Sequence, residues 1–142
     1  MKLPPRAVVD TNVLVAAVLK PTGICGRLLV AAVDGQWQPV VSPHLLYELE
    51  GVLRRPKFRD RLADDTVRDF VAAVVTVSYV VADPPPLPAP ETTDPDDEFL
   101  VALAHIADVD AIISGDSDLL DAALADPPVV TPAKFMTDLT ET

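Results

Sequence analysis

Four acidic side chains, far apart in the sequence, are the residues best suited to carry chemistry in this chain. Asp10 closes a short apolar run and Asp116 follows another, whereas Glu48 and Asp97 fall in segments with helical patterns. Carboxylate oxygens are hard ligands that suit Mg²⁺ or Mn²⁺. A cation held by them would activate water and stabilise the negative charge that develops on a phosphodiester.

Each of these residues also has a simpler interpretation. Asp10 could cap a helix as the chain leaves a strand, and Asp116, considered alone, is better explained as a helix N-cap. The acidic run Asp94–Glu98 suits the positive end of a helix, and an isolated Glu48 is most often a solvated side chain. Only the joint placement of the four carboxylates favours a metal site over these alternatives.

Other kinds of catalytic or metal site find little support in the sequence. His44 and His105 have neither metal-ligand spacing nor a nucleophile beside them, and Cys25 resembles a small apolar side chain on a helix. Neither a glycine-rich phosphate loop nor a G-x-S-x-G motif is present. We therefore expect any metal to be bound by oxygen ligands.

The apolar runs and capping residues predict strands that alternate with helices. Helices are expected over 13–19 (capped by Thr11 or Asn12), about 24–33, 44–55, from Asp64, after Glu98, from an Asp116 or Ser117 cap to about Ala125, and from Pro132. Such alternation favours a parallel sheet of about five strands covered on both faces, an α/β/α sandwich. The expected strands are Ala7–Asp10, Pro39–Ser42, Thr76–Ala82, Ala111–Ser114 and Val129–Thr131.

The expected sheet explains how the four carboxylates could meet. Open parallel sheets bind their ligands at the carboxyl ends of the strands. Asp10 and Asp116 follow strands, Glu48 lies on the helix after a strand, and Asp97 lies at a helix start. Carboxylates gathered at one edge would repel one another unless a cation neutralised them.

Chain length and composition predict a single domain spanning residues 1–142. The run 84–90, with five prolines, reads as an extended connector rather than a domain boundary. The longest uncharged apolar stretch, Phe70–Ala82, is too short to span a membrane, and Met1–Arg6 lacks the apolar segment of a signal peptide. One cysteine suits a reducing compartment, so the cytoplasm is the expected location.

The charge distribution is uneven. The net charge of −11 argues against nucleic-acid binding when taken alone. However, the chain has no Lys or Arg over 69–133, whereas six of its 11 basic residues gather over 54–68. This basic cluster has two interpretations that the sequence leaves open, a solvated helix face or a patch that contacts phosphates. Its members are Arg54, Arg55, Lys57, Arg59, Arg61 and Arg68.

Four segments in order resemble the motifs of PIN-domain nucleases, including VapC-like toxins. The resemblance covers about Arg6 to Phe135. It implies an α/β/α sandwich that cleaves RNA as an Mg²⁺- or Mn²⁺-dependent endoribonuclease and frequently forms a homodimer. It also implies an antitoxin protein as partner, in a toxin–antitoxin pair. The segments are Val8–Val15, Ser42–Leu49, Asp94–Leu100 and Ser114–Leu120.

The same resemblance assigns roles within these segments. Asp10, Glu48, Asp97 and Asp116 match the family's acidic residues, which implies both catalysis and metal binding. Helical periodicity does not choose between Asp96 and Asp97, but the resemblance favours Asp97. The secondary metal candidates are Asp96 and Asp118, and the expected substrate-contacting or supporting residues in these segments are Asn12 and Ser114. From the basic cluster, outside the four segments, Arg54 and Arg55 are also expected to contact the substrate. Ser114 stands where the family commonly has threonine.

Two other functions remain compatible with the sequence. One is an interaction module that keeps the fold without catalysis, although the presence of all four acidic matches weighs against it. The other is a phosphatase with Asp10 as nucleophile. Such enzymes favour a second aspartate two positions later, where this chain has Asn12.

Overall fold

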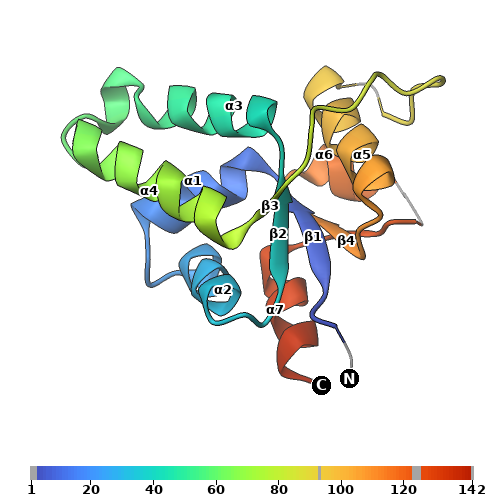
Figure 1. The fold of residues 1–142 in the computed structure, drawn as a ribbon, viewed down its shortest axis with the longest axis horizontal. Coiled ribbons are helices and arrows are strands. Elements are labelled where there is room, and N and C mark those ends of the chain that lie inside the picture. Colours follow the sequence, from blue (N-terminus) through green and yellow to red (C-terminus); the bar gives the residue numbers. More distant parts are fainter. Residues whose placement is uncertain (1–2, 93, 123–125, 142) are drawn as a thin grey trace.

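The computed structural model describes residues 3–92, 94–122 and 126–141. Five strands form one sheet in the order β3-β2-β1-β4-β5, and every neighbouring pair is parallel. The predicted parallel sheet of about five strands is therefore confirmed (Figure 1). Its strands are β1 (Arg6–Val9), β2 (Gln38–Val41), β3 (Tyr79–Val80), β4 (Ala111–Ile113) and β5 (Val129–Val130).

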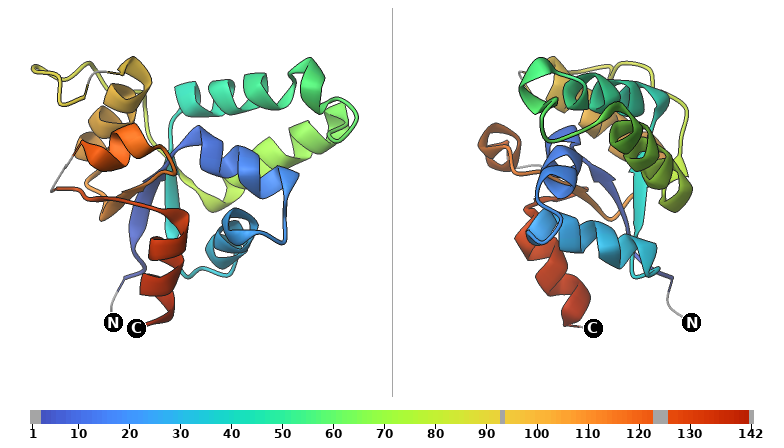
Figure 2. Two further views of the ribbon diagram at one scale, coloured as in Figure 1. Left: turned by 180° about the vertical axis from the view of Figure 1, so that it is seen from behind. Right: turned by 90° about the vertical axis from the view of Figure 1, so that its left-hand side faces the viewer.

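Helices cover both faces of this sheet, as the two views in Figure 2 show. One face packs against α1 (Thr11–Leu19), α2 (Ile24–Val33), α3 (Pro43–Leu53), α4 (Asp64–Val77) and α7 (Pro132–Thr140). The other packs against α5 (Pro95–Ala107) and α6 (Ser117–Asp121), with a contribution from Leu45 at the start of α3. The predicted three-layer α/β/α sandwich is thus confirmed.

Alternation along the strands divides the core into two clusters. Val9 and Ile113 point to the five-helix face, whereas Val8 and Ile112 point to the α5 face. The central strands β1 and β4 pair in the register Val8↔Ile112 and Val9↔Ile113. Because side chains alternate with a period of two, this pairing fixes which residues leave the sheet at its carboxyl edge.

Helix caps at the strand ends place acidic side chains at one edge of the sheet. The N-caps of α1, α5 and α6 are Asp10, Asp94 and Asp116, and each carboxylate accepts a backbone N–H from its own first helical turn. We expected Thr11 or Asn12 to cap α1, and that expectation was wrong. The chain turns into the helix one residue earlier, so Thr11 is already helical and buried.

The third strand is shorter than predicted. We expected it over Thr76–Ala82, but α4 continues through Val77 and only Tyr79–Val80 pair with β2. Val67 and Val74 are buried at helical spacing, and the Thr76 hydroxyl donates to the Ala72 carbonyl within the helix. Packing against the core thus outweighs the strand preference of the β-branched residues.

The proline-rich connector between β3 and α5 lies against the protein at several points. The Asp83 carboxylate accepts the His44 backbone N–H at 3.0 Å, and Leu87 packs against the α5-side core. Near its end, Glu98 accepts the N–H of Glu91 at 2.6 Å, and His105 bonds the Glu91 carboxylate at 2.9 Å. The connector therefore has a defined path past the first turns of α3 and α5.

Two remaining features concern helix lengths. Helix α6 begins after its Asp116 cap and is assigned to Asp121; its expected end near Ala125 falls outside the described residues. Among the described helices, none by itself is long and apolar enough to cross a membrane. Helices α1 and α2 pass that test only as a pair bent by 99°, and both pack into the core.

Candidate active site

The site lies at the carboxyl ends of the paired strands β1 and β4, where the chain connections run to opposite sides of the sheet. After β1 the chain continues to its neighbour β2, and after β4 it continues to β5 on the opposite side. Such a switch in direction opens a crevice at the carboxyl edge of a parallel sheet. Asp10 follows β1 at this edge, and its backbone N–H donates to the Ile113 carbonyl at 2.9 Å.

A buried hydroxyl connects the two sides of this crevice. The Ser114 Oγ is in a fully buried residue and donates to Asp10 Oδ2 at 2.8 Å. The same oxygen accepts the Asp116 backbone N–H at 3.0 Å. Asp10 Oδ1 accepts the Asn12 N–H at 3.2 Å, and Asp116 Oδ1 accepts the Asp118 N–H at 2.9 Å. These hydrogen bonds hold Asp10 at the start of α1 and Asp116 at the start of α6, and Ser114 links the two.

All four carboxylates predicted from the sequence line one cavity of about 490 Å³. The lining residues come from the first turns of α1 and α5, from α3 and the residue Arg55 beyond it, and from the N-cap of α6. Acidic and polar side chains make up most of the lining, together with four apolar ones. Its residues are Asp10, Thr11, Asn12, Leu45, Glu48, Val52, Arg55, Asp94, Asp96, Asp97, Phe99, Leu100 and Asp116.

Among these acids, Asp97 is the one whose pKa is clearly raised by its surroundings. It is only 5% exposed, and among the described residues no side chain or backbone N–H donates to its carboxylate. Burial raises the pKa of Asp97 to about 6, and the negative charges of Asp116, Asp94, Asp10 and Asp118 raise it further in that order of size. With this pKa the Asp97 carboxylate is mostly ionised at neutral pH, and a cation beside it would offset the repulsion from the neighbouring carboxylates.

The other two acids of the α5 segment have different surroundings. Asp94 is the N-cap, and its Oδ1 accepts the N–H groups of Asp96 at 2.8 Å and Asp97 at 3.4 Å. Asp96 is exposed, although it also lines the cavity. Asp94 was not among the site residues predicted from the sequence. The Asp-Pro step identifies it as a helix N-cap, but only the folded structure shows that it lines the cavity.

Glu48 reaches the cavity from α3, apart from the aspartates of α5. It is half-buried, and its Oε2 lies 3.7 Å from His44 Nε2. The His44 ring in turn contacts Phe99 of α5 in a tilted arrangement, with ring centroids 4.6 Å apart and an angle of 55° between the rings. Phe99 lines the cavity and was absent from our predictions because its place in an apolar helical stripe gave no sign of it.

The donor set fits a hard divalent cation. The charged groups of the cavity that could bind a cation are the carboxylates of Asp and Glu side chains, which are oxygen ligands. The chain's one cysteine lies on α2, outside the lining. Within the described residues, no three His, Cys, Asp or Glu side chains already stand in an arrangement that could hold a metal. Asp10 and Asp116 are instead turned toward Ser114 and the Asp118 N–H. The case for a metal therefore rests on the chemistry of the lining residues, above all on the Asp97 carboxylate, which accepts no hydrogen bond from the described residues.

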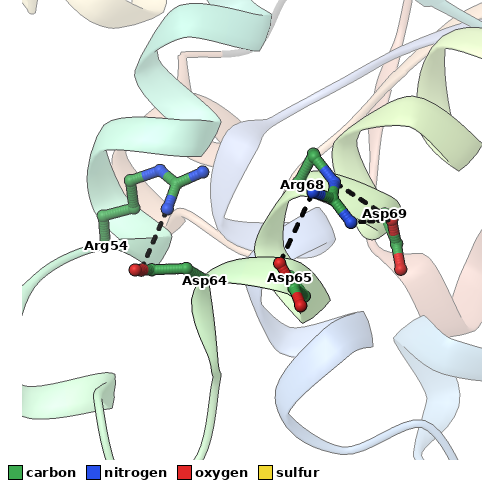
Figure 3. A network of polar contacts seen from close by, with 5 residues as sticks. All are labelled: Arg54, Asp64, Asp65, Arg68 and Asp69. Atoms are coloured by element: carbon green, nitrogen blue, oxygen red, sulfur yellow. Dashed lines mark hydrogen bonds and ion pairs between the residues drawn. The ribbon is translucent and has the colours of Figure 1, made fainter.

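Some side chains of the basic cluster form ion pairs within the part of the chain that the structure describes, and others do not. Arg54 contacts Glu50 and Asp64, each at 3.1 Å, and Arg68 pairs with Asp65 and Asp69 (Figure 3). Arg61 donates to the Leu19 carbonyl. Arg55, by contrast, lines the cavity. Of the two arginines we expected to contact a substrate, the structure therefore brings only Arg55 to the cavity.

The amino-acid sequence resembles those of known proteins. The family model described as PIN domain matches residues 6–118. The uncharacterized protein MJ1680 of Methanocaldococcus jannaschii is 28% identical over 125 residues, which cover 84% of this chain and 76% of that protein.

Two solved structures share the fold. PAE2754 from Pyrobaculum aerophilum has a TM-score of 0.70 at 13% sequence identity, covering 98% of this chain and 91% of that one. VapBC2 from Rickettsia felis, bound to a DNA fragment from their promoter, has a TM-score of 0.60 at 11% identity, covering 89% of this chain and 98% of that one.

The matched family span contains the whole candidate site. It runs from the first residue of β1 to the second residue of α6 and includes Asp10, Glu48, Asp97 and Asp116. Both structural neighbours share the overall fold of this chain. The chain therefore belongs to the PIN domain family.

Proposed function

We propose that this protein is an Mg²⁺- or Mn²⁺-dependent endoribonuclease whose site is the acidic cavity. PIN domains are generally nucleases, and this chain retains four cavity-lining carboxylates at the switch point of the sheet. The observation that carries the proposal is Asp97. Its buried carboxylate lacks a donor among the described residues and faces four other negative charges, an arrangement that a divalent cation would neutralise.

The residues have separate parts in this proposal. Asp10, Asp97, Asp116 and Glu48 would hold the metal, which when bound supplies an activated water and stabilises charge on the phosphodiester. Ser114 orients Asp10 by its hydrogen bond. Glu48, whose Oε2 lies 3.7 Å from His44 Nε2, would accept a proton in this proposal. Arg55 would contact a phosphate beside the cavity.

We further propose that the protein is the toxin of a toxin–antitoxin pair in the cytoplasm and acts as a homodimer. Support comes from the fold shared with VapBC2, which is described with promoter DNA. The likeness is one of fold, so the antitoxin of this chain must be sought directly. Co-purification from the native host, followed by mass spectrometry of the bound protein, tests this part of the proposal.

The nuclease proposal is tested with purified protein and a labelled RNA. We expect internal cleavage with Mg²⁺ or Mn²⁺, loss of cleavage in excess chelator, and recovery when metal is returned. Asp116→Asn should remove cleavage while the protein stays folded. Unchanged cleavage in chelator would contradict the metal mechanism. Folded, metal-binding protein without cleavage of any RNA would favour the interaction module, and hydrolysis of a simple phosphate ester would favour the phosphatase.

A further inference from the structure

Glu98 is an acidic residue of α5 that lies beside the cavity without lining it. It follows Asp97 directly, and successive residues of a helix point about 100° apart. Among the described residues of this segment, Asp94, Asp96 and Asp97 line the cavity, whereas the half-buried Glu98 does not. Its carboxylate therefore has surroundings that differ from those of the neighbouring aspartates.

The Glu98 carboxylate holds the end of the connector that leads into α5. Its Oε1 accepts the Glu91 backbone N–H at 2.6 Å and also accepts the Thr92 backbone N–H. About two turns further along the same face of α5, His105 Nε2 lies 2.9 Å from Glu91 Oε2. Glu98 and His105 thus bind the main chain and the side chain of the same connector residue.

The proline content of the connector explains why these contacts matter. Proline has no backbone N–H, so the five prolines over 84–90 leave this run with few groups that a side chain could hold. Glu91 and Thr92 carry the first two consecutive N–H groups after the prolines, and Glu98 accepts both. Hydrogen bonds to an ionised carboxylate are stronger than those between neutral groups. Glu98 consequently anchors the connector where it joins the helix.

The anchored segment leads directly into the acids of the cavity. The Thr92 hydroxyl donates to the Asp94 carbonyl at 3.2 Å, and Asp94 Oδ1 accepts the N–H groups of Asp96 and Asp97. Asp94 is both the N-cap of α5 and a lining residue. A shift of the chain before it would therefore move its carboxylate together with the first turn that carries Asp97.

We propose that Glu98 is a positioning residue for the acidic site. By holding Glu91 and Thr92, it keeps Asp94 and Asp97 in the cavity where a divalent cation would bind. His105 assists through its contact with Glu91, and Glu98 itself acts without contact to metal or substrate. This inference rests on the proposed metal-dependent function, and it adds a residue through which the connector acts on the site.

The test measures Mn²⁺ binding by the full-length protein, from the electron paramagnetic resonance signal of unbound Mn²⁺, alongside RNA cleavage. Glu98→Ala removes the acceptor, so its Mn²⁺ affinity should fall about tenfold or more, as is usual when a group that orients metal ligands is lost. Glu98→Gln keeps an oxygen that accepts the same two N–H groups, and its affinity should stay within about twofold of the wild type. Glu50→Ala, at a partly exposed glutamate inside α3 that pairs with Arg54, is the matched control and should bind Mn²⁺ as the wild type does.

A second variant keeps the test decisive if circular dichroism shows that Glu98→Ala does not fold. His105→Ala breaks the other contact with the connector at an exposed position, and its Mn²⁺ affinity should fall at least about threefold. Unchanged affinity in folded Glu98→Ala, or in His105→Ala when the first variant does not fold, would overturn the inference.

An equal loss of affinity in Glu98→Gln and Glu98→Ala would also overturn it, since Glu98 would then act by its charge and not by holding the connector. In each of these cases Mn²⁺ binding and metal-dependent cleavage by the wild type still support the proposed function, so the two failures are distinguishable. A wild type that neither binds Mn²⁺ nor cleaves RNA would remove both proposals.

Discussion

The Ser114 hydroxyl lies between two catalytic candidates and bonds to both: it donates to the Asp10 carboxylate at 2.8 Å and accepts the Asp116 N–H at 3.0 Å. Since Asp10 follows β1 and Asp116 follows β4, this single oxygen links the two strand ends across the switch point. The residue itself is fully buried, so no solvent can replace its bonds without a change in structure.

Ser114→Ala is therefore expected to affect both stability and activity. Loss of the hydroxyl leaves the Asp116 N–H unpaired in the protein interior, which should lower the free energy of unfolding by about 1–3 kcal/mol. It also frees Asp10, so turnover should fall more than RNA affinity does. Urea unfolding and single-turnover cleavage measure the two effects. Ser114→Thr keeps the hydroxyl and is the matched control; equal losses in both variants would contradict a role for the hydrogen bonds.

The pH dependence of stability should report on Asp97 in the metal-free protein. Its pKa is raised from 3.8 to about 6 by folding, so between these values the folded chain binds a proton that the unfolded chain does not. The contribution of Asp97 to the free energy of unfolding therefore decreases as pH rises through this window and is constant above it. Thermal melts in chelator from pH 4.5 to 7.5 should show that decrease for the wild type relative to Asp97→Asn.

The same substitution should stabilise the metal-free protein at pH 7.5. Asparagine removes the charge that costs about 1–3 kcal/mol in this buried, acidic place. Asp96→Asn, one residue away and exposed, is the control and should change stability less. A melting temperature for Asp97→Asn that is lower than that of the wild type would show that the carboxylate forms a stabilising contact instead.

Asp97→Asn and Asp96→Asn should also differ in nuclease activity, and here the Asp97 variant is the one that loses function. Asp97→Asn is expected to lose nuclease turnover by orders of magnitude, whereas Asp96→Asn should remain substantially active, since only Asp97 is buried within reach of the other charges. Mg²⁺ should raise the melting temperature of the wild type and of Asp96→Asn but not that of Asp97→Asn. Reversed results would move the metal site by one residue.

The salt dependence of RNA binding should distinguish the two adjacent arginines. Arg55 lines the cavity, whereas Arg54 is paired with Glu50 and Asp64. Arg55→Gln should therefore reduce the slope of log affinity against log salt concentration by about the contribution of one phosphate contact. Arg54→Gln should reduce that slope less. Equal slopes for the wild type and both variants would assign the whole basic cluster to the solvated surface.

The sequence predicted the sheet, its helices and the convergence of the four carboxylates because apolar runs, caps and strand ends are local signals. It could not predict the length of β3, which depends on how far α4 continues along the core. It also left the basic cluster open, since the pairing of Arg54 with Asp64 depends on how α4 lies against α3. The participation of Phe99 and Asp94 likewise depends on contacts between elements that no single segment encodes.

The strand order also determines when the site can exist during synthesis of the chain. Strands β1, β2 and β3 leave the ribosome first and are consecutive neighbours in the sheet, whereas β4 must later insert beside β1. A nascent chain that has reached only β3 carries Asp10 and Glu48 but neither Asp97 nor Asp116. For the nuclease we propose, a nascent chain thus lacks two of the four site carboxylates until Asp116 has been translated, and it cannot form the complete acidic cavity before then.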